Sequence, residues 1–113
     1  MSEFAFLFRG RNTSGSPEQM QQHLEKWVAW MKELGMKGCI KEQGHPLEGT
    51  GKVVKGHSKT VSDGPYAEAK DVVGGFMVIE AKDASHAAEI SKGCPILEVG
   101  GSVEVRPIQK LNL

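Results

Sequence analysis

Two side chains in the sequence, His23 and Asp63, are suited to proton transfer. His23 falls in a segment whose apolar residues recur at helical spacing, beside Trp27 and Trp30. This pattern predicts an imidazole at the edge of a helix's buried face, where it could face a cleft and exchange protons near neutral pH. The alternative is a surface histidine whose ring only packs along the edge of the helix.

Asp63 opens the turn Asp63-Gly64-Pro65. An aspartate in such a turn either accepts hydrogen bonds from backbone N–H groups, which is a structural role, or presents its carboxylate to a ligand. Both roles stay open at this point. We expect Asp63 to act as the acidic partner of His23 only if the turn folds over the helix.

Three further side chains, Arg9, Tyr66 and Arg106, could bind an organic ligand. Arg9 and Arg106 lie on the first and last expected strands, where a guanidinium group would bind either a substrate carboxylate or a partner subunit. Tyr66 follows the Asp-Gly-Pro turn and would supply an aromatic wall and a hydroxyl donor for a planar ligand.

The histidines and cysteines lack the spacing of a metal site. No two of the four histidines are four residues apart or form a His-x-His pair, and Cys39 and Cys94 form no Cys-x-x-Cys motif. The sequence therefore predicts no metal and no cofactor. Neither cysteine has an activating neighbour in sequence, so we expect no catalytic thiol. Trp27 and Trp30, at helical spacing, are expected in the core rather than on a ligand platform.

A strand and a helix open the chain. Residues 3–9 place Phe4, Phe6 and Phe8 on one face, the period-two pattern of a strand buried on one side. The run Ser16-Pro17-Glu18-Gln19 is a capping box with proline at the first helical position, so a helix begins there and Gly35 is expected to end it. The residues expected on its buried face are Met20, Leu24, Trp27, Val28, Met31 and Leu34.

The remaining elements are bounded by turn and cap residues. They are a strand at 37–43, a turn at 44–46, a polar hairpin at 51–62, a central strand at 72–81, a helix capped by Asp83 or Ser85 and ended by Gly93, and a strand at 102–107. Apart from the hairpin the order is β-α-β-β-α-β. This order predicts an α+β, ferredoxin-like split βαβ fold, with a four-stranded antiparallel sheet and both helices on one face.

The other face of that sheet would have no helix on it. We expect the alternation of Phe4, Phe6 and Phe8 to make this face apolar, so that two copies of the chain pair sheet to sheet as a homodimer. The hairpin and the Asp63 turn would then line a cleft at the rim.

Composition narrows the function classes. The chain has 113 residues, enough for a single domain over residues 1–113, and its 14 Lys+Arg balance 14 Asp+Glu. A balanced charge provides no field that would attract nucleic acid or an anionic membrane. The apolar run near the N-terminus is too short for a signal peptide or a membrane span. We therefore expect a cytoplasmic protein.

Several motifs occur together in one order along the chain. They are Leu7-Phe8-Arg9, Ser16-Pro17-Glu18-Gln19-Met20, Ser62-Asp63-Gly64-Pro65-Tyr66-Ala67-Glu68-Ala69-Lys70, Gly74-Gly75-Phe76 and Val103-Glu104-Val105-Arg106-Pro107. With them the sequence resembles the YCII-related domain family over nearly its whole length, in the branch named for an Asp-Gly-Pro-Phe (DGPF) signature. Tyr66 stands where the signature has phenylalanine.

The resemblance implies a dimeric α+β barrel, which agrees with the predicted order of elements. Members of the wider family resemble small-molecule lyases and isomerases with a His–Asp pair and a serine in a cleft, and one branch is associated with dechlorination of a hydroxylated aromatic. The DGPF branch is mostly of unassigned activity. His23 matches the family's cleft histidine, whereas the stretch that matches its acidic partner is Leu34-Gly35-Met36.

We therefore expect a cleft between sheet, hairpin and first helix that binds a small planar or carboxylated organic molecule. One hypothesis is a lyase- or isomerase-type enzyme in which His23 and Asp63 perform acid–base chemistry. The alternative is a non-catalytic ligand-sensing or accessory module that uses the same cleft. Contact between His23 and Asp63 would favour the enzyme, and their separation would favour binding alone.

Overall fold

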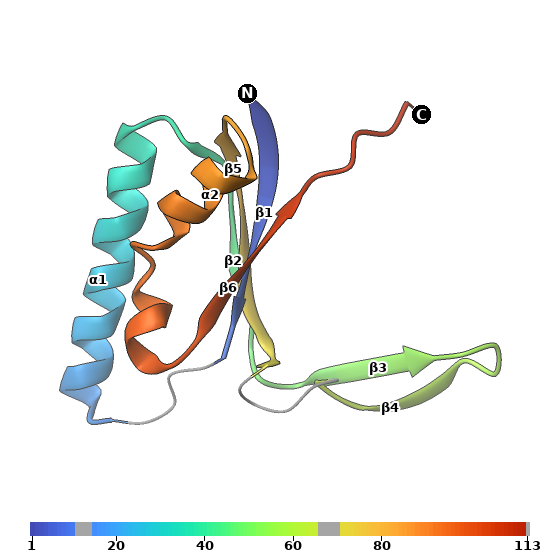
Figure 1. Ribbon diagram of the computed structural model, residues 1–113. Helices are drawn as coiled ribbons and strands as arrows, with labels where there is room; N and C mark the ends of the chain where they lie inside the picture. The colour runs from blue at the N-terminus through green and yellow to red at the C-terminus, as the bar shows by residue number, and fades with distance from the viewer. Residues whose placement is uncertain (11–14, 66–70, 113) are drawn as a thin grey trace.

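The computed structural model describes residues 1–10, 15–65 and 71–112 of the chain (Figure 1). Its elements, in chain order, are β1 (Ser2–Arg9), α1 (Pro17–Met36), β2 (Ile40–Pro46), β3 (Gly51–Lys55), β4 (Thr60–Gly64), β5 (Val73–Ala81), α2 (Ala84–Ser91), the short 3₁₀ helix η2 (Pro95–Val99) and β6 (Ser102–Pro107). The 3₁₀ helix was not predicted. None of the helices in these ranges is long and apolar enough to cross a membrane.

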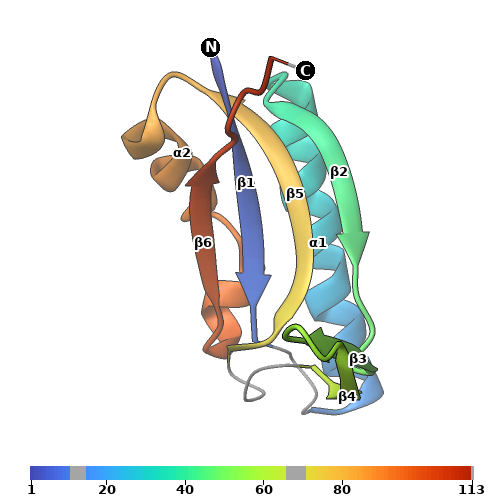
Figure 2. The same ribbon diagram turned by 90° about the vertical axis from the view of Figure 1, so that its right-hand side faces the viewer.

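Four strands form one antiparallel sheet in the order β2-β5-β1-β6. Both α1 and α2 lie on the same side of this sheet, as Figure 1 shows. The predicted ferredoxin-like α+β fold is therefore confirmed. Seen from the other side in Figure 2, the sheet has no helix in front of it, and we call this side the open face.

The aromatic side chains of β1 do not lie on the open face, so the prediction that they make it apolar is wrong. Phe4, Phe6 and Phe8 are 4%, 0% and 5% exposed and form the core beneath the helices. The helices must bury their own apolar residues, and the aromatic face of β1 offers the larger apolar area for that purpose. By strand alternation, Ala5 and Leu7 lie on the open face instead.

The capping box at the start of α1 is confirmed. The Gln19 backbone N–H donates to Ser16 Oγ at 3.1 Å, and the Ser16 backbone N–H donates to Gln19 Oε1 at 2.8 Å. The predicted end at Gly35 is too early, because the helix continues to Met36 and is capped by Lys37. The chain turns after that cap at Gly38, whose φ is +72°.

Only part of the apolar stripe predicted for α1 is buried. Of the residues predicted for it, Leu34 is buried, Trp27 and Met31 are partly buried, and Met20, Leu24 and Val28 are 47%, 55% and 58% exposed. The prediction of a single buried face along the whole helix is therefore wrong at these three exposed positions. The cause lies in the sheet, where Gly75 of β5 stands at a position from which a larger side chain would reach toward the helix.

Another glycine, Gly44, lies inside β2. The strand was predicted to end before it but runs on to Pro46, with two register shifts in its pairing to β5. Gly44 has φ +66°, and a Cβ atom there would overlap the carbonyl oxygen of Phe76. Only glycine satisfies both the positive φ and this close backbone approach.

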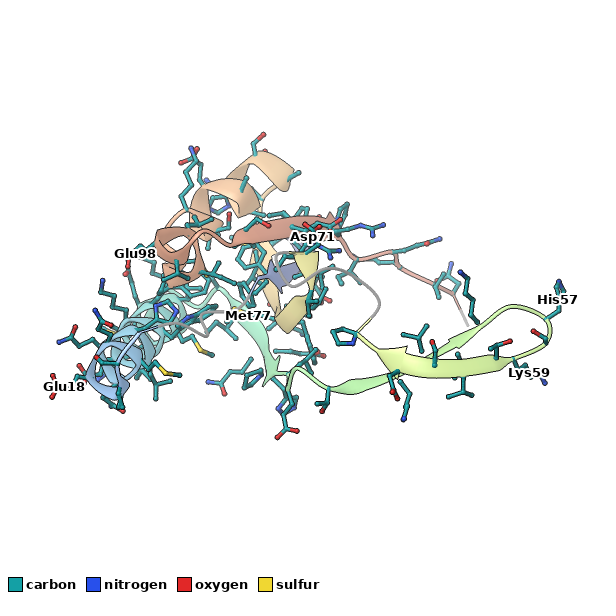
Figure 3. The ribbon with its side chains drawn as sticks, turned by 90° about the horizontal axis from the view of Figure 1, so that it is seen from below. Glu18, His57, Lys59, Asp71, Met77 and Glu98 are labelled. Atoms are coloured by element: carbon teal, nitrogen blue, oxygen red, sulfur yellow. The ribbon has the colours of Figure 1, made fainter. Side chains whose placement is uncertain are left out.

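The predicted hairpin is also confirmed. β3 and β4 pair only with each other and form a second, two-stranded sheet. It projects from the side of the main sheet opposite to the helices (Figure 1), and its tip carries His57 and Lys59 (Figure 3). We call this segment the hairpin arm.

We predict that Gly44→Ala destabilises the protein far more than Gly38→Ala. Both glycines have positive φ, but a Cβ at Gly38 meets nothing within 4 Å, so that variant isolates the backbone cost of about 1 kcal/mol. The clash with Phe76 should bring the loss at Gly44 to roughly 3 kcal/mol or more. Urea unfolding of both variants measures the difference, and equal losses would contradict the close approach.

Candidate functional site

A cavity of about 500 Å³ lies between α1, the end of β2 and the start of β5. Its lining is mostly apolar. The α1 side chains that contribute are His23, Leu24, Trp27, Val28 and Met31, the sheet contributes Phe8, Gly74, Gly75, Phe76 and Met77, and Gly10, residues 43–47 and Ile96 complete the wall. The partly exposed stretch of α1 from His23 to Met31 is thus one wall of this cavity.

Gly75 creates room in the cavity floor. The buried residues of β5 that follow it, Met77 and Ile79, alternate on the helix side, so Gly75 stands where the next inward side chain belongs. A Cβ there would lie 3.2 Å from the His45 carbonyl oxygen and 3.7 Å from the Phe8 ring. The backbones of β5 and β2 therefore approach each other closely at Gly75.

His23 is half-buried in the α1 wall. Its Nε2 accepts a hydrogen bond of 2.9 Å from the indole Nε1–H of Trp27, one helical turn later. In the described part of the chain no other hydrogen bond or ion pair involves His23. The cavity therefore has mostly apolar walls and one hydrogen-bonded polar pair, His23 and Trp27, which lie one helical turn apart on α1.

The indole of Trp27 is fixed by the core beneath it. Its ring meets Phe8 edge to face at 5.0 Å between centroids and Trp30 at 5.8 Å. Trp30, in turn, stacks on Phe6 at 6.4 Å. Trp30 thus belongs to the core, as predicted, whereas Trp27 is partly buried, packs against the core and also forms part of the cavity wall.

Asp63 lies on the hairpin arm and does not line this cavity. Its side chain is 87% exposed and forms an ion pair with Lys52 on the neighbouring strand. The structure therefore does not bring His23 and Asp63 into one cavity. Two roles were left open for Asp63. Among the described residues, its carboxylate accepts no hydrogen bond from a backbone N–H, as the structural role requires, and it does not line the cavity, as the ligand-binding role requires.

The two arginines lie on the open face, away from the cavity. Arg9 donates from Nε and Nη2 to Glu104 Oε1 at 3.0 and 2.7 Å, and from Nη1 to the Asp71 carbonyl oxygen at 2.7 Å. Arg106 pairs with Ala5 in the sheet and is exposed. Tyr66 lies outside the described residues.

Sequence reasoning missed the contribution of β2 to the site. His45 and Leu47 line the cavity although residues 44–46 had been interpreted as a turn. The imidazole of His45 packs edge to face on Phe76 at 6.1 Å between ring centroids. Phe76 pairs with Leu7 and alternates with Gly75 and Met77, so this ring contact lies on the open face, and it is the His45 carbonyl oxygen that approaches Gly75. Spacing along the chain could not reveal this contribution, because His23 and His45 come from different elements. Within the described ranges, no group of three or more potential ligands could hold a metal ion.

A second hollow, of about 610 Å³, lies between α1 and α2. Its charges are paired, with Lys26 Nζ 2.9 Å from Glu98 Oε2 and Lys37 Nζ 2.9 Å from Glu33 Oε1. None of the predicted site residues that the structure describes lines it. The cavity that contains His23 is therefore the candidate functional site.

Comparison with known proteins agrees with this architecture. A family model described as YCII-related domain matches residues 3–112. No curated protein matches the sequence at a significant level. Among solved structures, the chain is similar to 5-chloro-2-hydroxyhydroquinone dehydrochlorinase from Burkholderia phenoliruptrix AC1100, in complex with 2,5-dihydroxybenzoquinone. The identity is 19% and the TM-score 0.53, over 95% of this chain and 93% of that one, so this likeness shows a shared fold.

We predict that Cys94 is inert as a nucleophile in the folded protein. It is 2% exposed, and desolvation raises the pKa of its thiol to about 12. A pKa of about 12 leaves a thiolate fraction of roughly one in ten thousand at pH 8. Titration with a disulfide reagent at pH 8 should therefore detect Cys39 in the native protein and both cysteines after unfolding. A Cys39→Ser variant that still reacts when native would contradict the assignment.

Proposed function

Since the chain belongs to the YCII-related domain family, we propose that the cavity beneath α1 binds a small planar organic molecule and that the protein catalyses a lyase- or isomerase-type reaction on it. One observation carries the proposal: a titratable imidazole, that of His23, lines an otherwise largely apolar cavity of about 500 Å³. This volume and lining are typical of small-molecule sites. His23 is the residue that we assign to contact the bound molecule.

The chemistry of the structural neighbour supports a planar oxygenated ring as the substrate class. That protein is a dehydrochlorinase, and its bound 2,5-dihydroxybenzoquinone is such a ring. The aromatic wall formed by Trp27 and Phe8 fits a flat molecule. The signature Asp63-Gly64-Pro65 supports placing the chain in the DGPF branch.

A non-catalytic binding module is the second candidate. It is favoured by the separation of Asp63 from the cavity, because a proton-transfer enzyme of the predicted type would pair an acid with His23. In our proposal Asp63 reaches a bound molecule only from the hairpin arm of a second subunit. The two candidates share the ligand site and differ in whether a product forms.

We further propose that the protein is a cytoplasmic homodimer joined through the open face. The centre of this face is apolar, with Ala5, Leu7 and Val78, and none of these is fully exposed. Charged side chains such as Arg9 and Glu104 lie toward β6. An apolar centre with a charged margin is the usual composition of a subunit interface.

The hairpin arm supports the same assembly. It projects on the side of the open face (Figure 1) and exposes 65% of Val54 and 60% of Val61. An isolated two-stranded sheet is marginally stable on its own, so a second surface would stabilise it. In the proposed dimer, a second copy seated on the open face would supply that surface. Both cysteines are free thiols, which fits the proposed cytoplasmic location.

We predict that His23→Gln abolishes most of the function while His57→Gln does not. His57 lies at the tip of the hairpin arm (Figure 3) and provides the same substitution away from the cavity. With 2,5-dihydroxybenzoquinone as the probe, the wild-type protein should show a thermal shift that His23→Gln reduces. Any turnover of the probe or its chlorinated analogues should fall about a hundredfold in His23→Gln, with stability changed by less than about 1 kcal/mol.

The same measurements separate the two candidates. Binding with product formation supports the enzyme, and binding without any product across planar phenols and quinones supports the binding module. If the probe binds equally well to wild-type protein and His23→Gln, the cavity is not the site and the proposal is wrong.

We predict that Leu7→Lys converts the dimer to a monomer. A lysine at the centre of the open face would bury a charge in an interface of on the order of 1,200 Å² or more. Leu97→Lys is the matched control, because Leu97 is 43% exposed on η2 in the helical layer. Sedimentation of the wild-type protein and both variants at micromolar concentration measures the assembly. A monomeric wild-type protein would rule out the dimer.

A further inference from the structure

We infer that Trp27 is a positioning residue that holds His23 in the Nδ1–H tautomer, so that His23 offers a hydrogen-bond donor rather than a base to the molecule in the cavity. The role of His23 as a donor to a bound molecule rests on the proposed function, whereas the tautomer itself does not. It narrows the substrate class to a ring that carries an acceptor oxygen, such as a quinone or a phenolate.

The direction of the hydrogen bond between the two side chains is fixed by chemistry. An indole Nε1–H can only donate, so at 2.9 Å the Nε2 atom of His23 must be the acceptor. An accepting Nε2 carries no proton. A neutral imidazole has one ring proton, and it must therefore lie on Nδ1.

Trp27 can impose this tautomer because its ring is held from two other sides. Phe8 meets it edge to face at 5.0 Å and Trp30 at 5.8 Å, with interplanar angles of 87° and 79°. The i, i+4 spacing on α1 then brings the indole N–H to His23. The core of the protein thus selects which nitrogen of His23 is protonated.

The tautomer determines what His23 can do in the cavity. Its Nε2 lone pair is occupied by Trp27, and within the described ranges no protein group accepts from Nδ1–H. Neutral His23 therefore has no free lone pair with which to remove a proton from a substrate. It can donate a hydrogen bond to an oxygen on which negative charge develops, and no proton needs to leave the ring.

His86 provides an internal reference with the opposite tautomer. The backbone N–H of Lys82 donates to His86 Nδ1 at 3.0 Å. The single proton of a neutral His86 therefore lies on Nε2. Both histidines stand on helices, so the contrast between them comes from their hydrogen-bond partners.

Long-range ¹H–¹⁵N correlation spectra of the full chain, recorded without ligand at a pH where the imidazoles are neutral, test this inference. In the wild-type protein we expect the Nδ1–H pattern for His23 and the Nε2–H pattern for His86. In Trp27→Phe, His23 should change to the Nε2–H pattern that free imidazole side chains favour, while His86 should not change. Trp30→Phe is the matched control, because the Trp30 indole makes no hydrogen bond to His23.

An Nε2–H pattern for wild-type His23 would overturn the inference, as would an Nδ1–H pattern that persists in a folded Trp27→Phe variant. The wild-type spectrum decides the tautomer even if the variant fails to fold. The proposed function fails separately. If 2,5-dihydroxybenzoquinone does not bind while His23 shows the Nδ1–H pattern, the ligand assignment is wrong and the tautomer assignment stands.

Discussion

The packing of the β1 phenylalanines against the two α1 indoles is the contact on which the rest of the molecule depends. Phe6 stacks on Trp30 and Phe8 meets Trp27 edge to face, so the helix can occupy only one position along the strand. This burial stabilises the fold without directional bonds. It also sets the rotation of α1 about its axis, and this rotation places the half-buried His23 in the wall of the cavity. The geometry of the site is thus a consequence of core packing.

Glycine provides the counterpart of this aromatic packing at the other end of the sheet. At Gly75 and Gly44 the backbones of β5 and β2 approach each other closely, and Gly75 places no side chain toward α1. Leu24 and Val28 of the helix consequently have little to pack against, and both side chains remain exposed. One helix therefore covers both a filled core, where the sheet carries phenylalanines, and an open cavity, where it carries Gly75.

The sequence was informative wherever the signal is local. The capping box at Ser16, the Asp83 cap that accepts the His86 backbone N–H, and the hairpin all follow from short-range chemistry, and the order of elements then led to the sheet. Local signals could not show which face of β1 the helices cover, because alternation is symmetric between the two faces. They also could not show the β2 segment around His45, since the Gly44-His45-Pro46 run is typical of a turn and becomes a strand only through pairing with β5. His23 was found by its helical position, but its hydrogen bond to Trp27 depends on rotamers that the core selects.

The irregular pairing of β2 has a consequence for the behaviour of the protein at high concentration. β2 is an edge of the sheet, and a long regular edge would act as a template for strands from other molecules. The register shifts around Glu42 and Gly44 bend this edge, and Pro46 removes a backbone donor from it. The residues that shape one wall of the cavity therefore also make this edge a poor template for edge-to-edge pairing, which should disfavour fibrous aggregation through β2.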